Sequence, residues 1–138
     1  MFFSTNGTGI GLSLLRSRIR PDGGTDELSI MQMAQARGAR VWSVPSSPPV
    51  AFKDSGTVNG GNFRGGAATN QAYANQLATY VANMKNQGVN LYAISIQNEP
   101  NYNTTNYESC VWSGQQFHDF VPYLYNALAA SNVSTTRI

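Results

Sequence analysis

The sequence predicts an α/β fold built on parallel strands, and three observations lead to this prediction. Segments with strand patterning alternate with segments of helical spacing in the order β-α-β-α-β-α-β. Gly38 and Gly88 end the first two expected helices and leave only short connections to the strands that follow. The most continuous apolar run, residues 89–96, is typical of a parallel strand covered on both faces. Short helix-to-strand connections imply parallel strands with right-handed crossovers.

The first expected unit runs from a strand over 9–19, in which apolar and smaller residues alternate before two arginines arrive. The Pro-Asp-Gly-Gly segment at 21–24 breaks this strand. Apolar residues at helical spacing then predict a helix over 28–37. A second, short strand over 39–44 follows and is stopped by Pro45.

A long loop is expected from Pro45 to about Asn70, where the composition shifts to Ser, Pro and Gly. Loops at the C-terminal ends of strands often carry function. Asn70 is expected to be the N-cap of the next helix, which ends at Gly88. The apolar face of that helix is Tyr73, Leu77, Tyr80, Val81 and Met84.

The third unit begins after a loop over 98–112. Ser113 and Gln116 have the spacing of a capping box, which predicts the start of a third helix. Its buried stripe is expected to be Phe117, Phe120, Val121, Leu124 and Leu128. Residues 135–138 have the pattern of a fourth strand at its opening.

Two architectures fit this alternation, a closed eight-stranded barrel and an open doubly wound sheet. A complete barrel needs about 250 residues, so a chain of 138 residues could supply about half of one. An open sheet should carry a glycine-rich phosphate turn after its first strand, and Arg16-Ser17-Arg18 stands there instead. No second domain is expected within 1–138.

Composition excludes several classes of function. Only 12% of the residues are charged, the net charge is +2 and the nine basic residues are scattered, so no nucleic-acid surface is expected. No apolar stretch approaches a membrane span, and the first residues lack the pattern of a signal peptide. The single cysteine, Cys110, excludes a disulfide framework and a cysteine metal cluster, and no metal or cofactor motif is present.

Glu99 is the strongest candidate for chemistry. It directly follows the buried strand, between Asn98 and Pro100, so its carboxyl is expected at the strand's C-terminal end, where parallel α/β folds place catalytic groups. On spacing alone, Asn-Glu-Pro fits equally well a segment that only ends the strand and leads into the next helix.

The motifs around Glu99 resemble those of glycoside hydrolase family 30. Residues 93–102, Ala-Ile-Ser-Ile-Gln-Asn-Glu-Pro-Asn-Tyr, and 107–112, Tyr-Glu-Ser-Cys-Val-Trp, are similar to the family's fourth barrel strand and its loop. In the same order, 11–19 resembles the second strand, 44–49 with 52–54 the third strand and loop, and 88–92 the entry to the fourth. The resemblance covers nearly the whole chain.

The resemblance implies a partial (β/α)₈ TIM barrel, made of about strands 2 to 4 with their helices and the start of strand 5. Members of the family hydrolyse β-linked glycans with retention, and they include glucuronoxylan endoxylanases. The implied function is therefore a glycoside hydrolase acting on a β-linked plant polysaccharide, xylan above all, without a cofactor. Full-length relatives are secreted.

Site roles also follow from the resemblance. It makes Glu99 the general acid/base, Asn98 the residue that binds the sugar 2-hydroxyl, and Arg16 a buried arginine that orients the carboxylates. Tyr102 and Trp112 are expected as rings that bind the substrate. Ser46 stands where many relatives have a tryptophan.

The family's nucleophile belongs to the seventh strand, and this chain ends as the fifth begins. Among the other acids, only Asp54 and Glu108 are expected in loops on the side of Glu99. The rival hypothesis is a catalytically inactive carbohydrate-binding or structural half-barrel, and a third is an open-sheet nucleotide binder. A half-barrel also has two open sheet edges, which self-association could cover.

Overall fold

The chain folds as alternating strands and helices around one parallel sheet. The computed structural model describes residues 2–138, with strands β1 (Leu14–Ile19), β2 (Arg40–Pro45) and β3 (Ala93–Ile94), helices α1 (Leu28–Gln35), α2 (Ala67–Asn86) and α3 (Gly114–Ala130), and a short 3₁₀ helix η1 (Val50–Phe52). The strands pair in parallel in the order β1-β2-β3. The predicted α/β class is therefore confirmed. Within 2–138, no helix combines the length and apolarity that a membrane span requires.

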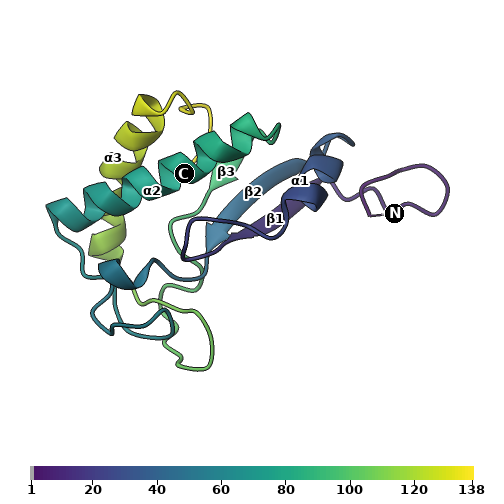
Figure 1. Cartoon of the computed structure of the whole chain (residues 1–138). Coiled ribbons are helices and arrows are strands. Elements are labelled where there is room, and N and C mark those ends of the chain that lie inside the picture. The colour runs from purple at the N-terminus through teal and green to yellow at the C-terminus, as the bar shows by residue number, and fades with distance from the viewer. Residues whose placement is uncertain (1) are drawn as a thin grey trace.

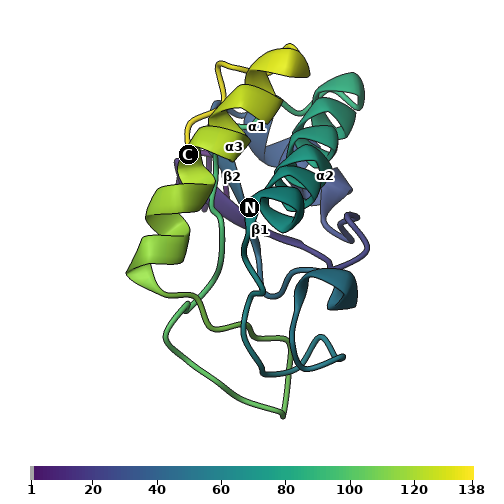
Figure 2. The same cartoon turned by 90° about the vertical axis from the view of Figure 1, so that its left-hand side faces the viewer.

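The helices all lie on one face of the sheet, as Figures 1 and 2 show from two directions. When strands that follow each other in sequence are also neighbours, crossovers of one hand carry every helix to the same side. A doubly wound sheet instead reverses its strand order at a switch point and has helices on both faces. The sequential order therefore favours the barrel type of architecture over the open-sheet alternative.

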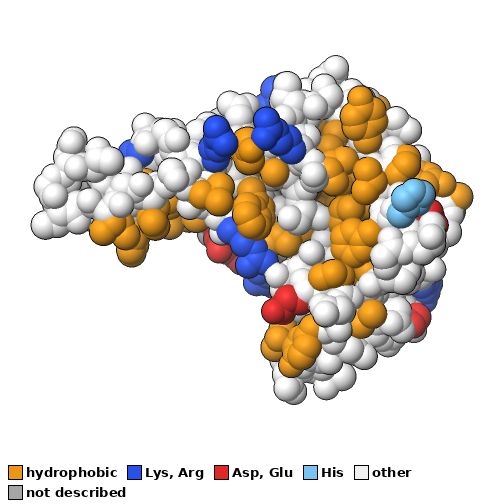
Figure 3. Space-filling model, turned by 180° about the vertical axis from the view of Figure 1, so that it is seen from behind, with side chains coloured by type: hydrophobic (Ala, Val, Ile, Leu, Met, Phe, Trp, Pro, Cys, Tyr) orange, Lys and Arg blue, Asp and Glu red, His pale blue; other side chains and the backbone are white. Residues whose placement is uncertain are grey.

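Side chains of β1 alternate between a covered and an open face. Ser17 and Ile19 are buried toward the helices, whereas Arg16 and Arg18 are exposed. On the covered face, Ser17 Oγ lies 2.6 Å from Ser43 Oγ, which lies 3.0 Å from the Tyr80 hydroxyl of α2. Figure 3 shows the molecule from behind, where Lys and Arg side chains lie among hydrophobic ones.

The first strand is shorter than the expected 9–19. Residues before Leu14 form an arm that bonds to itself, with the Leu12 N–H donating to the Phe2 carbonyl at 2.9 Å. Ile10 is 68% exposed, so its apolar side chain does not serve the core. The alternating pattern was present, but the amides of Gly9, Gly11 and Leu12 have partners in the arm, and only the Ser13 carbonyl in this segment accepts from β2, from the Arg40 N–H at 2.9 Å.

The strand expected over 89–96 is regular only at Ala93–Ile94. Three carbonyls of β2 accept hydrogen bonds from this segment. Val41 accepts from the Tyr92 N–H at 2.8 Å, Ser43 from the Ser95 N–H at 2.9 Å, and Pro45 from the Asn98 N–H at 2.9 Å. The acceptors are two residues apart along β2, whereas the donors are three residues apart. The extra residue at each step interrupts the ladder in the manner of a β-bulge. The expected fourth strand opens as a single parallel bridge between Arg137 and Ala93.

The prediction that Asn70 caps α2 is wrong. The helix begins three residues earlier, at Ala67, after Gly66 in a left-handed conformation (φ 83°). The Asn70 N–H donates to the Gly66 carbonyl at 2.9 Å, and its side chain is buried within the helix. Gly38 and Gly88 follow α1 and α2 at φ values of 81° and 80°, as expected of helix C-terminal glycines.

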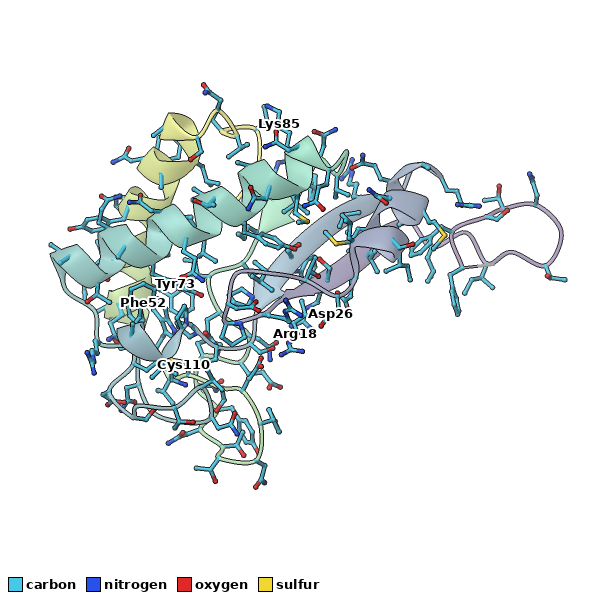
Figure 4. All side chains as sticks on the ribbon, viewed as in Figure 1. Arg18, Asp26, Phe52, Tyr73, Lys85 and Cys110 are labelled. Atoms are coloured by element: carbon cyan, nitrogen blue, oxygen red, sulfur yellow. The ribbon has the colours of Figure 1, made fainter. Side chains whose placement is uncertain are left out.

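Aromatic side chains join the helices to the loops beneath them. The Phe63 and Trp112 rings stack at 3.7 Å, and Tyr73 of α2 and Phe120 of α3 pack around them. Figure 4 shows Phe52, Tyr73 and Cys110 gathered where α2 meets the loops. All five predicted apolar residues of α2 are buried. In α3, by contrast, Val121 is 40% exposed.

The capping box at α3 gives the first prediction. Ser113 Oγ accepts from the Gln116 N–H at 3.1 Å, and the Gln116 side chain accepts from the Ser113 N–H at 2.8 Å. We expect Ser113→Ala to lower the free energy of unfolding by about 1 kcal/mol, because it removes an acceptor for a free helical N–H. Urea unfolding measures this, with the exposed Ser134→Ala as the control; equal stabilities for the two variants would contradict it.

Candidate active site

The C-terminal ends of the three strands bring the predicted site residues to one edge of the sheet. Arg16 and Arg18 come from β1, Ser46 follows β2, and Asn98 and Glu99 come soon after β3. The Asn98 N–H donates to the Pro45 carbonyl at 2.9 Å, which ties the segment carrying Glu99 to the end of β2.

Arg16, Asn98 and Glu99 form a continuous chain of hydrogen bonds. Arg16 Nη2 donates to Asn98 Oδ1, and Asn98 Nδ2 donates to Glu99 Oε2 at 3.3 Å. A guanidinium can only donate, so the amide oxygen of Asn98 must face Arg16. This fixes the amide so that its NH₂ group faces Glu99.

The backbone at Glu99 is in the left-handed region, with φ 45°. This conformation is uncommon for a residue with a Cβ and often occurs at functional sites. The turn is held on both sides, because the Tyr102 N–H donates to the Glu99 carbonyl at 2.9 Å and the Trp112 N–H to the Pro100 carbonyl at 2.8 Å. The Glu99 side chain is exposed at this turn, next to Asn98.

The expectation that Arg16 is buried is wrong for this chain. Arg16 lies on the exposed face of β1, which no helix within residues 2–138 covers. Its contact with Asn98 nevertheless agrees with an orienting role, because it reaches Glu99 only through that amide.

Tyr102 and Tyr107 form an exposed aromatic pair beside Glu99. Their ring centroids lie 6.3 Å apart at an interplanar angle of 26°, and each side chain is about half exposed. Partial desolvation raises the pKa of Tyr107, and the nearby Tyr102 and Glu99 raise it further. The pair is therefore within electrostatic reach of the Glu99 carboxylate.

Trp112 is not placed to stack on a substrate. Only 4% of it is exposed, and its ring is stacked on Phe63 within the core. The expectation that Trp112 binds substrate conflicts with this burial. Trp112 instead stabilises the turn after Glu99, because its backbone N–H donates to the Pro100 carbonyl.

A pocket of about 370 Å³ adjoins this edge, lined by Arg18, Ser46, Asn59, Tyr107 and Glu108. Arg18 Nη2 lies 2.5 Å from Glu108 Oε1, whereas Glu108 Oε2 is buried without a hydrogen-bond partner. The sequence reasoning did not single out Arg18. Its place two residues after Arg16 could have identified it as a site residue, because alternate residues of a strand lie on the same face.

Asp54, the other acid expected near Glu99, is bound within its own loop. Asn62 donates to it twice, from its backbone N–H at 2.7 Å and from Nδ2 at 2.8 Å. These hydrogen bonds hold the pKa of Asp54 below its usual value. Asp54 and Glu108 therefore both have partners other than Glu99.

Other possible sites are few within residues 2–138. No group of three His, Cys, Asp or Glu side chains in this range could hold a metal ion. A second pocket, of about 590 Å³, lies between the N-terminal end of α2 and the middle of α3 and contains none of the predicted site residues.

Cys110, two residues after Glu108 and two before Trp112, is fully buried. Burial raises the pKa of its thiol from 9.0 to about 11, an effect that nearby Lys53 partly opposes. The thiol is therefore protonated at neutral pH.

Comparisons with known proteins find that the chain is similar to xylanases over most of its length. No family model matches it. It is 34% identical over 116 residues to a glucuronoxylanase, XynC, of Bacillus subtilis (strain 168), covering 81% of this chain and 27% of that protein. The chain thus spans about a quarter of the length of the curated relatives it matches.

Two solved structures are similar over most of the chain. The catalytic domain of xylanase C from Talaromyces cellulolyticus, of glycoside hydrolase family 30, has a TM-score of 0.84 at 30% identity, covering 97% of this chain and 38% of that chain. A xylanase of subfamily 8 of that family, from Clostridium acetobutylicum, has a TM-score of 0.76 at 37% identity, covering 88% and 34%.

The buried thiol predicts a particular dependence on pH. Between about pH 9 and 11 the unfolded chain releases the Cys110 proton while the folded chain keeps it, so the stability contributed by the thiol falls as pH rises. We expect the stability advantage of wild type over Cys110→Ala to shrink between pH 8 and 10, by about 1 kcal/mol. Urea unfolding of both proteins at each pH measures this. A difference that stays constant with pH would contradict it.

Proposed function

Since the chain has the fold of a glycoside hydrolase family 30 xylanase over the part that it spans, we propose that it carries the general acid/base of a retaining β-glycanase. Glu99 is the proposed acid/base, and a β-linked plant polysaccharide, with xylan favoured, is the proposed substrate. In this proposal 1–138 is a partial catalytic barrel, β1 to β3 correspond to strands 2 to 4, and Arg137 lies at the start of the fifth.

The chain of hydrogen bonds from Arg16 through Asn98 to Glu99 carries the proposal. A retaining glycosidase protonates the leaving oxygen with one carboxylic acid, and the same group then removes a proton from water. Asn98, oriented by Arg16, is suited to hydrogen-bond both the carboxylate and a hydroxyl of the bound sugar. Arg16 acts as a positioning residue, since it reaches the carboxylate only through Asn98.

The nucleophile is proposed to come from a part of the enzyme other than 1–138. Retention needs a second, ionised carboxylate about 5–5.5 Å from the acid. Glu108 is paired with Arg18 and Asp54 with Asn62, so neither is free for this role. This observation also favours the second candidate function, a chain that holds carbohydrate without cleaving it.

The substrate is proposed to lie over the Tyr102–Tyr107 pair and the adjoining pocket. Exposed aromatic rings offer flat apolar faces to sugars, and Tyr hydroxyls add polar contacts. Glu108 lines this pocket, and its Oε1 is held by Arg18. A polymeric substrate also implies action outside the cell, and no contact with nucleic acid or membrane is proposed.

Self-association is proposed only as a property of the isolated chain. The outer edge of β1 is unpaired in the sheet order β1-β2-β3, and an unpaired edge can bond to another chain. Light scattering gives the mass in solution and thereby decides this point.

Glu99→Gln tests the proposed chemistry. In an enzyme that contains both 1–138 and the proposed nucleophile, we expect it to lower the release of reducing sugar from xylan by about 100-fold or more, because the amide keeps the size of the side chain but cannot donate a carboxyl proton. β-Glucan and β-galactan serve as alternative substrates, and the exposed Asp26→Asn is the control. If wild type and Glu99→Gln release sugar from every substrate at the same rate, the chain does not cleave by this route.

Tyr107→Ala tests the proposed binding surface independently of cleavage. We expect xylotetraose affinity to fall by about 3- to 10-fold, in line with the loss of one aromatic contact. An NMR titration measures this. The control is Tyr125→Ala, which removes from α3 a ring that is 64% exposed, against 51% for Tyr107. Equal affinities for both variants would contradict the placement of the substrate.

A further inference from the structure

Lys53 is a fully buried cation at the base of the loops that surround the pocket. It is 0% exposed, and its ammonium donates to Ser47 Oγ at 2.9 Å, the Val58 carbonyl at 2.8 Å and the Ser109 carbonyl at 2.5 Å. An ammonium has three donors, so all of them are used. Lys53 forms no salt bridge within the described part of the chain.

This arrangement is unusual for a lysine. A buried charge costs free energy unless hydrogen bonds replace its hydration, and Lys is almost never fully buried without a partner. Desolvation lowers the pKa of Lys53, and this effect is partly opposed by Cys110, Asp54 and Glu108. The three oxygens replace water around the ammonium, so the loops are arranged around Lys53.

Each acceptor of Lys53 is the chain neighbour of a residue that lines the pocket. Ser47 follows Ser46, Val58 precedes Asn59, and Ser109 follows Glu108. These pairs come from three separate segments, namely the end of β2, the loop before α2 and the loop after Glu99.

Two further hydrogen bonds connect the same segments. The Val58 carbonyl that accepts from Lys53 also accepts from the Ser109 N–H at 3.2 Å. Ser109 Oγ accepts from the Gly60 N–H at 3.0 Å. The loops therefore meet at Lys53 and are cross-linked around it.

We propose that Lys53 is a positioning residue for substrate binding: its ammonium holds three walls of the pocket in register and thereby orients Glu108 and Tyr107 beside Glu99. It does not touch the substrate. The substrate part of this inference rests on the proposed function, whereas the positioning part does not.

The test compares wild type, Lys53→Met and Ser47→Ala, using xylotetraose as the probe. Met keeps most of the length of the side chain but has no donor, and Ser47→Ala removes one acceptor of the three. We expect Lys53→Met to weaken binding by at least tenfold and Ser47→Ala by a smaller factor. Leu128→Ala is the matched control, because it destabilises the core at α3 and should leave affinity unchanged.

Amide hydrogen exchange adds a readout that needs no ligand. We expect the Gly60 and Ser109 amides to exchange at least tenfold faster in Lys53→Met and measurably faster in Ser47→Ala, while those of Met84 and Leu124 in α2 and α3 stay protected. If Lys53→Met does not fold, Ser47→Ala decides alone.

The outcomes separate the two proposals. Unchanged exchange at Gly60 and Ser109 in a folded variant overturns the positioning role, and so does an equal loss of affinity in Leu128→Ala. If wild type does not bind xylotetraose while the exchange rates rise as expected, the proposed function fails at this substrate and Lys53 keeps its role in ordering the loops.

Discussion

The arrangement of the site depends on the parallel pairing of β1, β2 and β3. Parallel strands end at the same edge of a sheet, so side chains far apart in the sequence meet there. This pairing brings Arg16 to Asn98, which lies 82 residues later, and Arg18 to Glu108, which lies 90 residues later. Neither contact would form if the connecting helices reversed the order of the strands.

Much of the helical structure could be predicted because its signals are local. Gly38, Gly88 and the capping box at Ser113 mark ends that depend on a few neighbouring residues. The strand boundaries were harder to predict, because a strand forms only where its backbone groups bond to a neighbouring strand that is distant in the sequence. The amides of Gly9, Gly11 and Leu12 bond within the arm, and the segment before Glu99 uses three residues for every two residues of β2. The apolar pattern of the sequence shows neither event, and in the arm it does not even mark burial, since Ile10 is 68% exposed.

Part of the candidate site could be predicted from the sequence in the same way as the helix ends, from local motifs. Glu99 and Asn98 are adjacent, so a single motif located both, and the motif's family resemblance linked them to Arg16. The burial of Trp112 depends on Phe63, which lies in a glycine-rich loop whose path no periodicity describes. The burial of Lys53 could not be predicted either, because a basic residue in a loop is expected to be hydrated. Its three acceptors become neighbours only after the chain has folded.

The left-handed backbone conformation at Glu99 is strained, so this residue lowers the stability of the turn that contains it. Asparagine and glycine adopt such a conformation at lower cost than glutamate, so the chain retains a strained residue where a relaxed one was available. Directed evolution that selects only for heat resistance would therefore tend to discard the carboxylate. Screens of this chain need a selection for catalysis in parallel, because thermostability favours asparagine or glycine at this position whereas the proposed acid/base role requires glutamate.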